Sequence, residues 1–111
     1  MAEVISAAGL QQFHCAETEK APHVTYFFNG GVEPPFPGES RDIIPSPKVA
    51  TYDLQPQMSA AAVADSVLDA IDSQQYQFVL VNLANTDMVG HTAVPAAIIS
   101  AVEAAALQVH V

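Results

Sequence analysis

The chain has 111 residues, with 12 acidic side chains against three basic ones and therefore a formal net charge of −9. Its length fits one small domain. Half of the residues are apolar and only 14% are charged, a balance that predicts a hydrophobic core rather than a disordered acidic tail. The basic residues, Lys20, Arg41 and Lys48, are scattered, which argues against binding to nucleic acid or to an anionic membrane surface.

The apolar runs are too short to cross a bilayer, which takes about 20 residues. The first ten residues contain no Lys or Arg, so they do not resemble a secretory signal. The single cysteine, Cys15, has no partner for an internal disulfide, which fits a reducing compartment. We interpret it as a small buried apolar side chain rather than a nucleophile.

The first quarter of the chain predicts a short helix, a short strand and one ambiguous segment. The helix covers residues 2–8 and ends at a glycine, and the strand covers Gln11–Ala16. Segment Thr18–Phe28 has apolar residues at helical spacing and a proline that a first helical turn tolerates. A strand over Val24–Phe28 is the competing interpretation.

A proline-rich stretch, about residues 32–57, contains six of the eight prolines. This density breaks helices and sheets, so we expect an extended connection along the surface. Ile43 and Ile44 are its one predicted strand.

The second half predicts a helix, a buried strand and a final helix. Ser59 is a suitable N-cap for a helix that runs to about Ser73, with three aspartates facing water: Asp65, Asp69 and Asp72. The continuous apolar run Phe78–Leu83 is typical of a strand covered on both faces of a parallel sheet. A loop over Asn85–His91 then leads to a helix over about Pro95–Leu107. This order is typical of an α/β fold, in which ligands bind at the carboxyl ends of strands.

The loop after the buried strand contains the most suggestive pair of side chains. Asp87 and His91 are four residues apart, and carboxylate and imidazole together suit a divalent ion such as manganese or zinc. The same spacing also occurs in helix caps and in local hydrogen-bonded pairs, which is the alternative interpretation. Two side chains do not complete a metal site, so further ligands would have to come from elsewhere.

Lys20 follows a predicted strand end. It could bind a phosphate group as a point charge, with Glu17 or Glu19 fixing its orientation. A surface lysine beside two glutamates is the alternative. The remaining histidines have no partners at ligand spacing and are expected at the surface or half-buried: His14, His23 and His110.

Four motifs, in this order along the chain, resemble the cofactor-independent (2,3-bisphosphoglycerate-independent) phosphoglycerate mutases of the alkaline phosphatase superfamily. They are 16–20 (AETEK), 23–31 (HVTYFFNGG), 45–53 (PSPKVATYD) and 87–92 (DMVGHT). The resemblance implies a three-layer α/β/α sandwich with a mostly parallel sheet, in agreement with the α/β prediction. Residues 1–111 would form a single, partial, metal-binding domain of that sandwich.

The resemblance also implies a reaction. In this family a serine takes the phosphoryl group from 3-phosphoglycerate and returns it to give 2-phosphoglycerate, a glycolytic isomerisation assisted by two manganese ions. By resemblance, Asp87 and His91 are ligands of one manganese ion, and Lys20 contacts the phosphoryl group. A cytoplasmic location is implied, or a plastid or other organelle.

The resemblance leaves the site incomplete in this chain. Family members are several times longer, and the segments with the nucleophilic serine, the other metal ligands and the substrate-binding arginines have no counterpart here. We therefore expect no activity from this chain alone, and we expect the rest of an enzyme or a partner protein to cover the edge of its sheet. The alternative is a non-catalytic structural or interaction subunit of a larger assembly. Local departures from the family pattern occur at Phe13, His14, Ala21–Pro22, Thr86 and Ala93.

Overall fold

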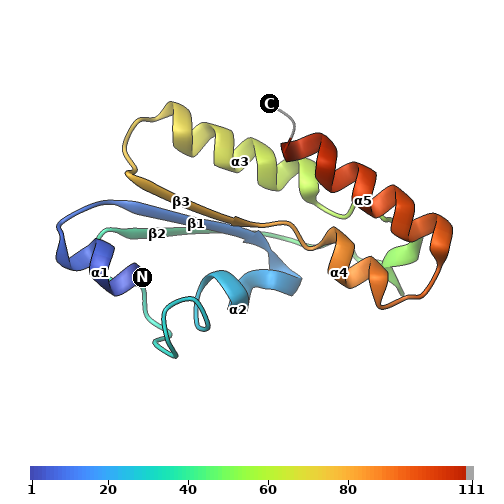
Figure 1. The fold of residues 1–111 in the computed structure, drawn as a ribbon, viewed down its shortest axis with the longest axis horizontal. Coiled ribbons are helices and arrows are strands. Elements are labelled where there is room, and N and C mark those ends of the chain that lie inside the picture. Colours follow the sequence, from blue (N-terminus) through green and yellow to red (C-terminus); the bar gives the residue numbers. More distant parts are fainter. Residues whose placement is uncertain (110–111) are drawn as a thin grey trace.

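A three-stranded parallel sheet with the strand order β2-β1-β3 organises the computed structural model, which describes residues 1–109 (Figure 1). Helices α3 and α5 lie on one face of the sheet, and α1 and α2 lie on the other. The α/β prediction is confirmed. The elements in chain order are α1 (Ala2–Ala7), β1 (Gln12–Glu17), the 3-10 turn η1 (Thr18–Lys20), α2 (Ala21–Val24), β2 (Glu39–Ile44), the 3-10 turn η2 (Tyr52–Leu54), α3 (Ala60–Asp72), β3 (Phe78–Asn82), α4 (Asn85–Gly90) and α5 (Pro95–Val109).

The central strand, β1, is buried along its whole length. Alternate side chains point to opposite faces of a strand. Phe13 and Cys15 pack against α3 in an apolar cluster with Val63 and Ala70, so the prediction of a buried Cys15 is confirmed. A second apolar cluster joins α4 and α5 to the end of the proline-rich stretch, and its buried members are Met58, Ala84, Val89, Ala97 and Ala101.

His14 does not lie at the surface, contrary to the sequence-based expectation, because its ring is 0% exposed. Its Nδ1 lies 2.7 Å from the carbonyl oxygen of Val24, and its Nε2 lies 2.9 Å from the side-chain amide of Gln12. A buried imidazole is tolerated when its nitrogens have such partners. His23 is exposed, as expected, and His110 lies outside the described residues.

The proline-rich stretch contains a longer strand than the predicted pair Ile43 and Ile44. Strand β2 has six residues and pairs with β1 from Gln12↔Glu39 to Glu17↔Ile44. The prolines at 37 and 45 lie just outside the strand, where they break no hydrogen bond of the sheet. The density of prolines therefore led to an underestimate of the length of β2. The positions of the prolines, on either side of residues 39–44, mark the strand better.

The structure settles the ambiguous segment Thr18–Phe28 and corrects the predicted loop that follows β3. In Thr18–Phe28 the helical interpretation is confirmed for Ala21–Val24, and the strand over Val24–Phe28 is wrong because the chain turns there. The predicted loop over Asn85–His91 is largely helical, as α4.

The helix α3 begins where predicted, and its three aspartates are exposed as expected. However, Ser59 does not cap it, because the hydroxyl donates to the carbonyl oxygen of Pro45 at 2.7 Å instead. The strand β3 is only half-buried, since within residues 1–109 it pairs with β1 alone. No helix in this range is long and apolar enough to cross a membrane.

Val63 supports the packing of α3 on the sheet and should be sensitive to truncation. Its side chain is 0% exposed, so Val63→Ala leaves a cavity and should lower the free energy of unfolding by about 2 kcal/mol. Urea denaturation followed by circular dichroism measures the change. The matched control is Val4→Ala, at a position 71% exposed, which should change stability by less than about 0.5 kcal/mol. Equal losses in the two variants would contradict this packing.

Candidate functional site

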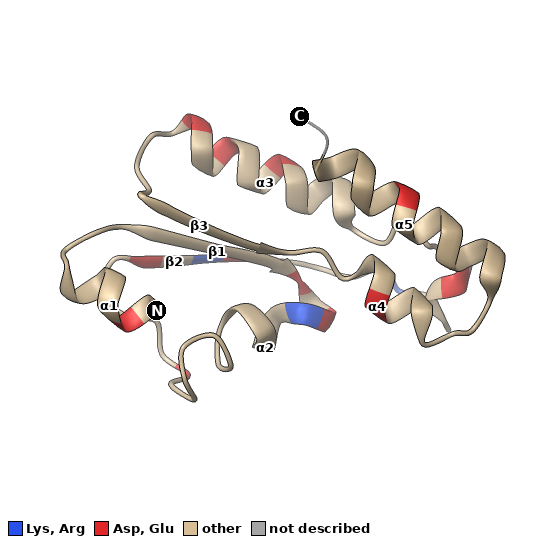
Figure 2. Cartoon of the chain, viewed as in Figure 1, with Lys and Arg blue, Asp and Glu red and all other residues tan. Residues whose placement is uncertain are grey.

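The three residues singled out from the sequence lie together at the carboxyl ends of β1 and β3. Lys20 ends the turn η1 that follows β1, and Asp87 lies in the first turn of α4, which follows β3. The ammonium of Lys20 forms an ion pair with Oδ2 of Asp87 across 67 positions of sequence. Figure 2 shows a basic, blue segment next to α2 and an acidic, red segment on α4. The parallel sheet thus brings both strand ends to one edge, where α/β folds bind ligands.

His91 joins this pair through the helical turn. Its Nε2 lies 3.2 Å from Oδ1 of Asp87. The helical turn of α4 brings these side chains, four residues apart, onto one face, which a loop need not do. One carboxylate therefore faces an ammonium with one oxygen and an imidazole with the other. The hydrogen bond from Lys20, with a smaller effect of His91, holds the pKa of the Asp87 carboxyl below its usual range.

The exposure of the three side chains differs in a useful way. Lys20 is only 11% exposed, whereas Asp87 is 49% and His91 75% exposed. The interpretation of Lys20 as a surface lysine beside two glutamates is therefore wrong, because its partner is Asp87 and its stem is covered. The two possible metal-binding side chains remain open to a ligand.

A carboxylate oxygen and an imidazole nitrogen suit a divalent ion of the first transition series. When each donor is about 2.1 Å from one ion and the bonds are at right angles, the two atoms are about 3 Å apart. The observed 3.2 Å between Asp87 and His91 fits this arrangement. Within residues 1–109, however, no group of three or more His, Cys, Asp or Glu side chains could hold a metal ion. The described part of the chain therefore offers two donors and no further member of a coordination shell.

Polar residues with partners that the sequence analysis did not predict surround η1. Glu17 and Glu19, expected to orient Lys20, form hydrogen bonds with other residues instead. The carboxylate of Glu17, 1% exposed, accepts hydrogen bonds from the Ser46 hydroxyl at 2.9 Å and from the Ser59 amide at 3.3 Å. Tyr52 donates its hydroxyl proton to Glu19 at 2.7 Å. The sequence did place Glu17 directly after a predicted strand, which could have indicated a buried carboxylate. Its partners Ser46 and Ser59 are far away in sequence and cannot be inferred from spacing.

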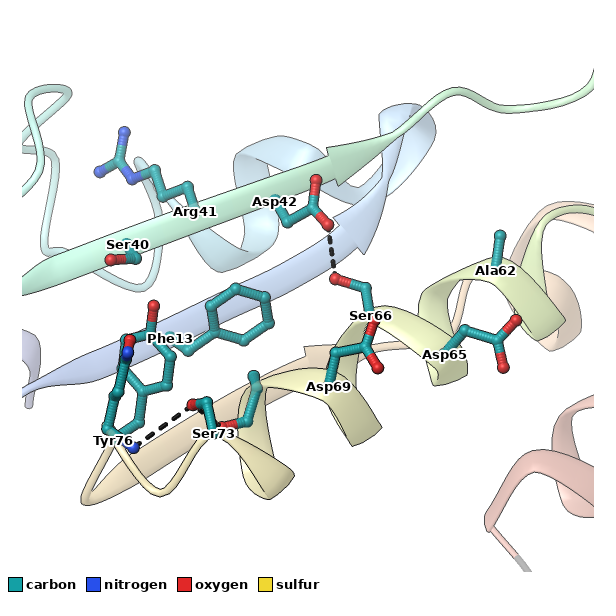
Figure 3. A pocket seen from close by; sticks show the side chains of 12 residues that line it. Phe13, Ser40, Arg41, Asp42, Ala62, Asp65, Ser66, Asp69, Ser73 and Tyr76 are labelled. Atoms are coloured by element: carbon teal, nitrogen blue, oxygen red, sulfur yellow. Dashed lines mark hydrogen bonds between the residues drawn. The ribbon is translucent and has the colours of Figure 1, made fainter.

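An open pocket of about 640 Å³ lies elsewhere, between α3 and the free edge of β2 (Figure 3). Its lining includes Phe13, Asp42 and Tyr76 and none of the three candidate residues. The hydroxyl of Ser66 donates to Asp42 there at 2.5 Å. The pocket is thus separate from the ion pair at the carboxyl edge.

The family model of the Metalloenzyme superfamily matches residues 1–110. The chain belongs to the Metalloenzyme superfamily. A solved structure of similar fold is that of a phosphoglycerate mutase of Leishmania mexicana, determined at low cobalt concentration. It has a TM-score of 0.94 and 36% identity over 97% of this chain and 20% of its own. The three-layer architecture expected from the sequence is thereby confirmed.

Curated proteins from bacteria are more similar to the chain in sequence. The 2,3-bisphosphoglycerate-independent phosphoglycerate mutase of Chloroflexus aurantiacus is 66% identical over 104 residues, which are 94% of this chain and 19% of the relative. The enzyme of the same name from Thermomicrobium roseum is 66% identical over 103 residues, or 93% and 20% respectively. The chain therefore spans about a fifth of the length of the curated relatives that it matches.

The buried carboxyl of Glu17 should make stability depend on pH. Burial raises the pKa of Glu17 above its ordinary value of 4.5, so ionisation costs more in the folded than in the unfolded state. Its contribution to stability is therefore lost as pH rises from about 4.5 through the folded-state pKa. Glu17→Gln cannot ionise, so its free energy of unfolding should rise relative to the wild type over that range.

Urea denaturation between pH 4 and pH 8 measures this difference. The matched control is Glu3→Gln, which removes the same charge from an exposed position on α1. The account is wrong if the stability difference from the wild type follows pH equally in the two variants.

Proposed function

We propose that the chain supplies part of the catalytic centre of a cofactor-independent phosphoglycerate mutase, which interconverts 3-phosphoglycerate and 2-phosphoglycerate. The observation that carries this proposal is the meeting of Lys20, Asp87 and His91 at the carboxyl edge of the sheet. The 66% identity to a mutase over nearly the whole chain supports the choice of reaction. Membership of a metalloenzyme superfamily supports a role for a metal ion.

In this proposal Asp87 and His91 hold one manganese ion. Their oxygen and nitrogen are at a suitable separation, and both side chains are accessible. A bound divalent ion would supply neutralisation of the charge on phosphoryl oxygens. Manganese is chosen over zinc or cobalt by resemblance to the mutases.

Lys20 binds the phosphoryl group in this proposal. Its covered stem leaves little freedom to the side chain, and Asp87 holds the ammonium at the strand end. A preplaced positive charge stabilises the negative charge of a phosphoryl group in transfer without reorganisation. Asp87 thus has two roles, since one oxygen orients Lys20 and the other faces His91.

The nucleophile, the other metal ligands and the groups that bind the glycerate come from the rest of a larger enzyme in this proposal. The relatives are about five times as long as the matched region, which leaves room for these parts. The same parts would cover the apolar side chains now exposed around the open edge of β3, such as Val81, Leu68 and Ile71. This covering would convert the half-buried β3 into the fully covered strand that its apolar sequence predicts.

Manganese binding tests the metal site directly. We expect weak binding of Mn²⁺ by this chain, seen as paramagnetic broadening of the His91 and Asp87 amide signals in NMR spectra. His91→Ala should weaken it by about tenfold or more, because it removes one of two donors. His23→Ala, at an exposed position on α2, is the matched control and should leave binding unchanged. Equal weakening by both substitutions would rule out His91 as a ligand.

The incomplete site should also be inactive by itself. With Mn²⁺ and 3-phosphoglycerate present, we expect no 2-phosphoglycerate from the purified chain in an assay coupled to enolase. Turnover that disappears in Lys20→Met would show that the chain already contains a complete site.

A further inference from the structure

We propose that Glu17 is a positioning residue, whose buried carboxylate ties the connection 45–59 to the end of β1 and so holds Lys20 against Asp87. The catalytic meaning of this inference rests on the proposed function. The contact that it concerns, however, is measured without metal and without catalysis.

The surroundings of Glu17 are unusual for a residue that serves stability alone. Its side chain is 1% exposed, and within residues 1–109 no Lys, Arg or His forms an ion pair with it. Among the described residues, its carboxylate oxygens accept only from neutral donors, the Ser46 hydroxyl and the Ser59 amide. Burying a charge costs free energy unless it is well paired. An apolar residue at the end of a buried strand would avoid this free-energy cost. We therefore expect the carboxylate to have a role other than stability.

Ser46 transmits the position of Glu17 to the turn that carries Lys20. Its hydroxyl donates to Glu17 at 2.9 Å, which leaves the lone pairs of the oxygen for the backbone N–H of Glu19 at 3.4 Å. The backbone N–H of Ser46 donates to the hydroxyl of Thr18 at 3.2 Å. The residues of η1 that precede Lys20 are thus both bound to one serine, whose orientation depends on Glu17.

The far end of the same connection holds α4. The side-chain amide of Asn85, 0% exposed, donates to the carbonyl oxygens of Pro56 at 2.8 Å and Gln57 at 2.7 Å. Asn85 begins α4, two positions before Asp87. The connection 45–59 is therefore bound to η1 at one end and to α4 at the other, and it sets the separation between Lys20 and Asp87.

A purely structural role for Glu17 makes a different prediction. It would lower the free energy of unfolding when Glu17 or Ser46 is changed, but the contact between Lys20 and Asp87 would persist in the folded molecules. A positioning role requires loss of that contact while the sheet remains intact. The contact itself, rather than stability, is therefore the discriminating measurement.

NMR spectroscopy of the metal-free chain gives this measurement. The wild type should show a nuclear Overhauser cross-peak between the terminal methylene of Lys20 and the β-protons of Asp87. Ser46→Ala, Glu17→Ala and the double variant should all lose the cross-peak, since both residues act through one hydrogen bond. Ser66→Ala is the matched control, because Ser66 also donates to a carboxylate but lies in the pocket beside β2, and it should keep the cross-peak. Ser46→Thr retains the hydroxyl and should keep it too.

An unchanged cross-peak in a folded Ser46→Ala variant would overturn the proposal, as would its absence from the wild type. If Glu17→Ala does not fold, Ser46→Ala decides the question, because it removes only one partly exposed hydroxyl. A wild type that shows the cross-peak but binds no Mn²⁺ would count against the proposed function and leave this inference standing.

Discussion

The ion pair between Lys20 and Asp87 is the interaction on which the candidate site depends, because it joins the ends of two strands that are far apart in sequence. A partly exposed ion pair contributes little to stability, typically less than about 1 kcal/mol. The pair therefore cannot organise its own surroundings. Its geometry is imposed by the parallel register of β1 and β3 and by the connection 45–59 that contacts both η1 and α4.

The central strand β1 shows the cost of this arrangement. The side chains of Phe13 and Cys15, which pack against α3, are apolar. Three other buried positions of β1 are polar: Gln12, His14 and Glu17. Gln12 and His14 satisfy each other and the backbone of α1 and α2, so they secure the helices of the second face. Glu17 instead accepts hydrogen bonds from Ser46 and Ser59, in the connection that borders the candidate site. Polar groups buried in a small domain reduce its hydrophobic stabilisation, and here they fix where the strand ends and the site begins.

Apolar patterns predicted the elements whose signal lies within one continuous stretch of sequence. Helix α3, strand β3 and helix α5 follow apolar patterns, and Lys20, Asp87 and His91 stand out by their chemistry next to predicted strands. Strand β2 was largely missed because four of its six residues are polar and prolines flank it. The short helix α4 has no side-chain cap to mark its start, so it was expected as a loop. The pairing of Lys20 with Asp87, and the partners of Glu17, arise from tertiary contacts that no local pattern encodes.

We propose that this chain supplies Lys20, Asp87 and His91 to a site that the rest of a larger enzyme completes. Reconstitution tests it most directly: the chain is mixed with the Chloroflexus aurantiacus mutase from which the matching 104 residues have been removed, and mutase turnover is measured with Mn²⁺. We expect turnover only when both polypeptides are present. It should be lost when the chain carries Lys20→Met or His91→Ala and kept when the chain carries His23→Ala. Stable association without turnover, or turnover that survives Lys20→Met and His91→Ala, would contradict it.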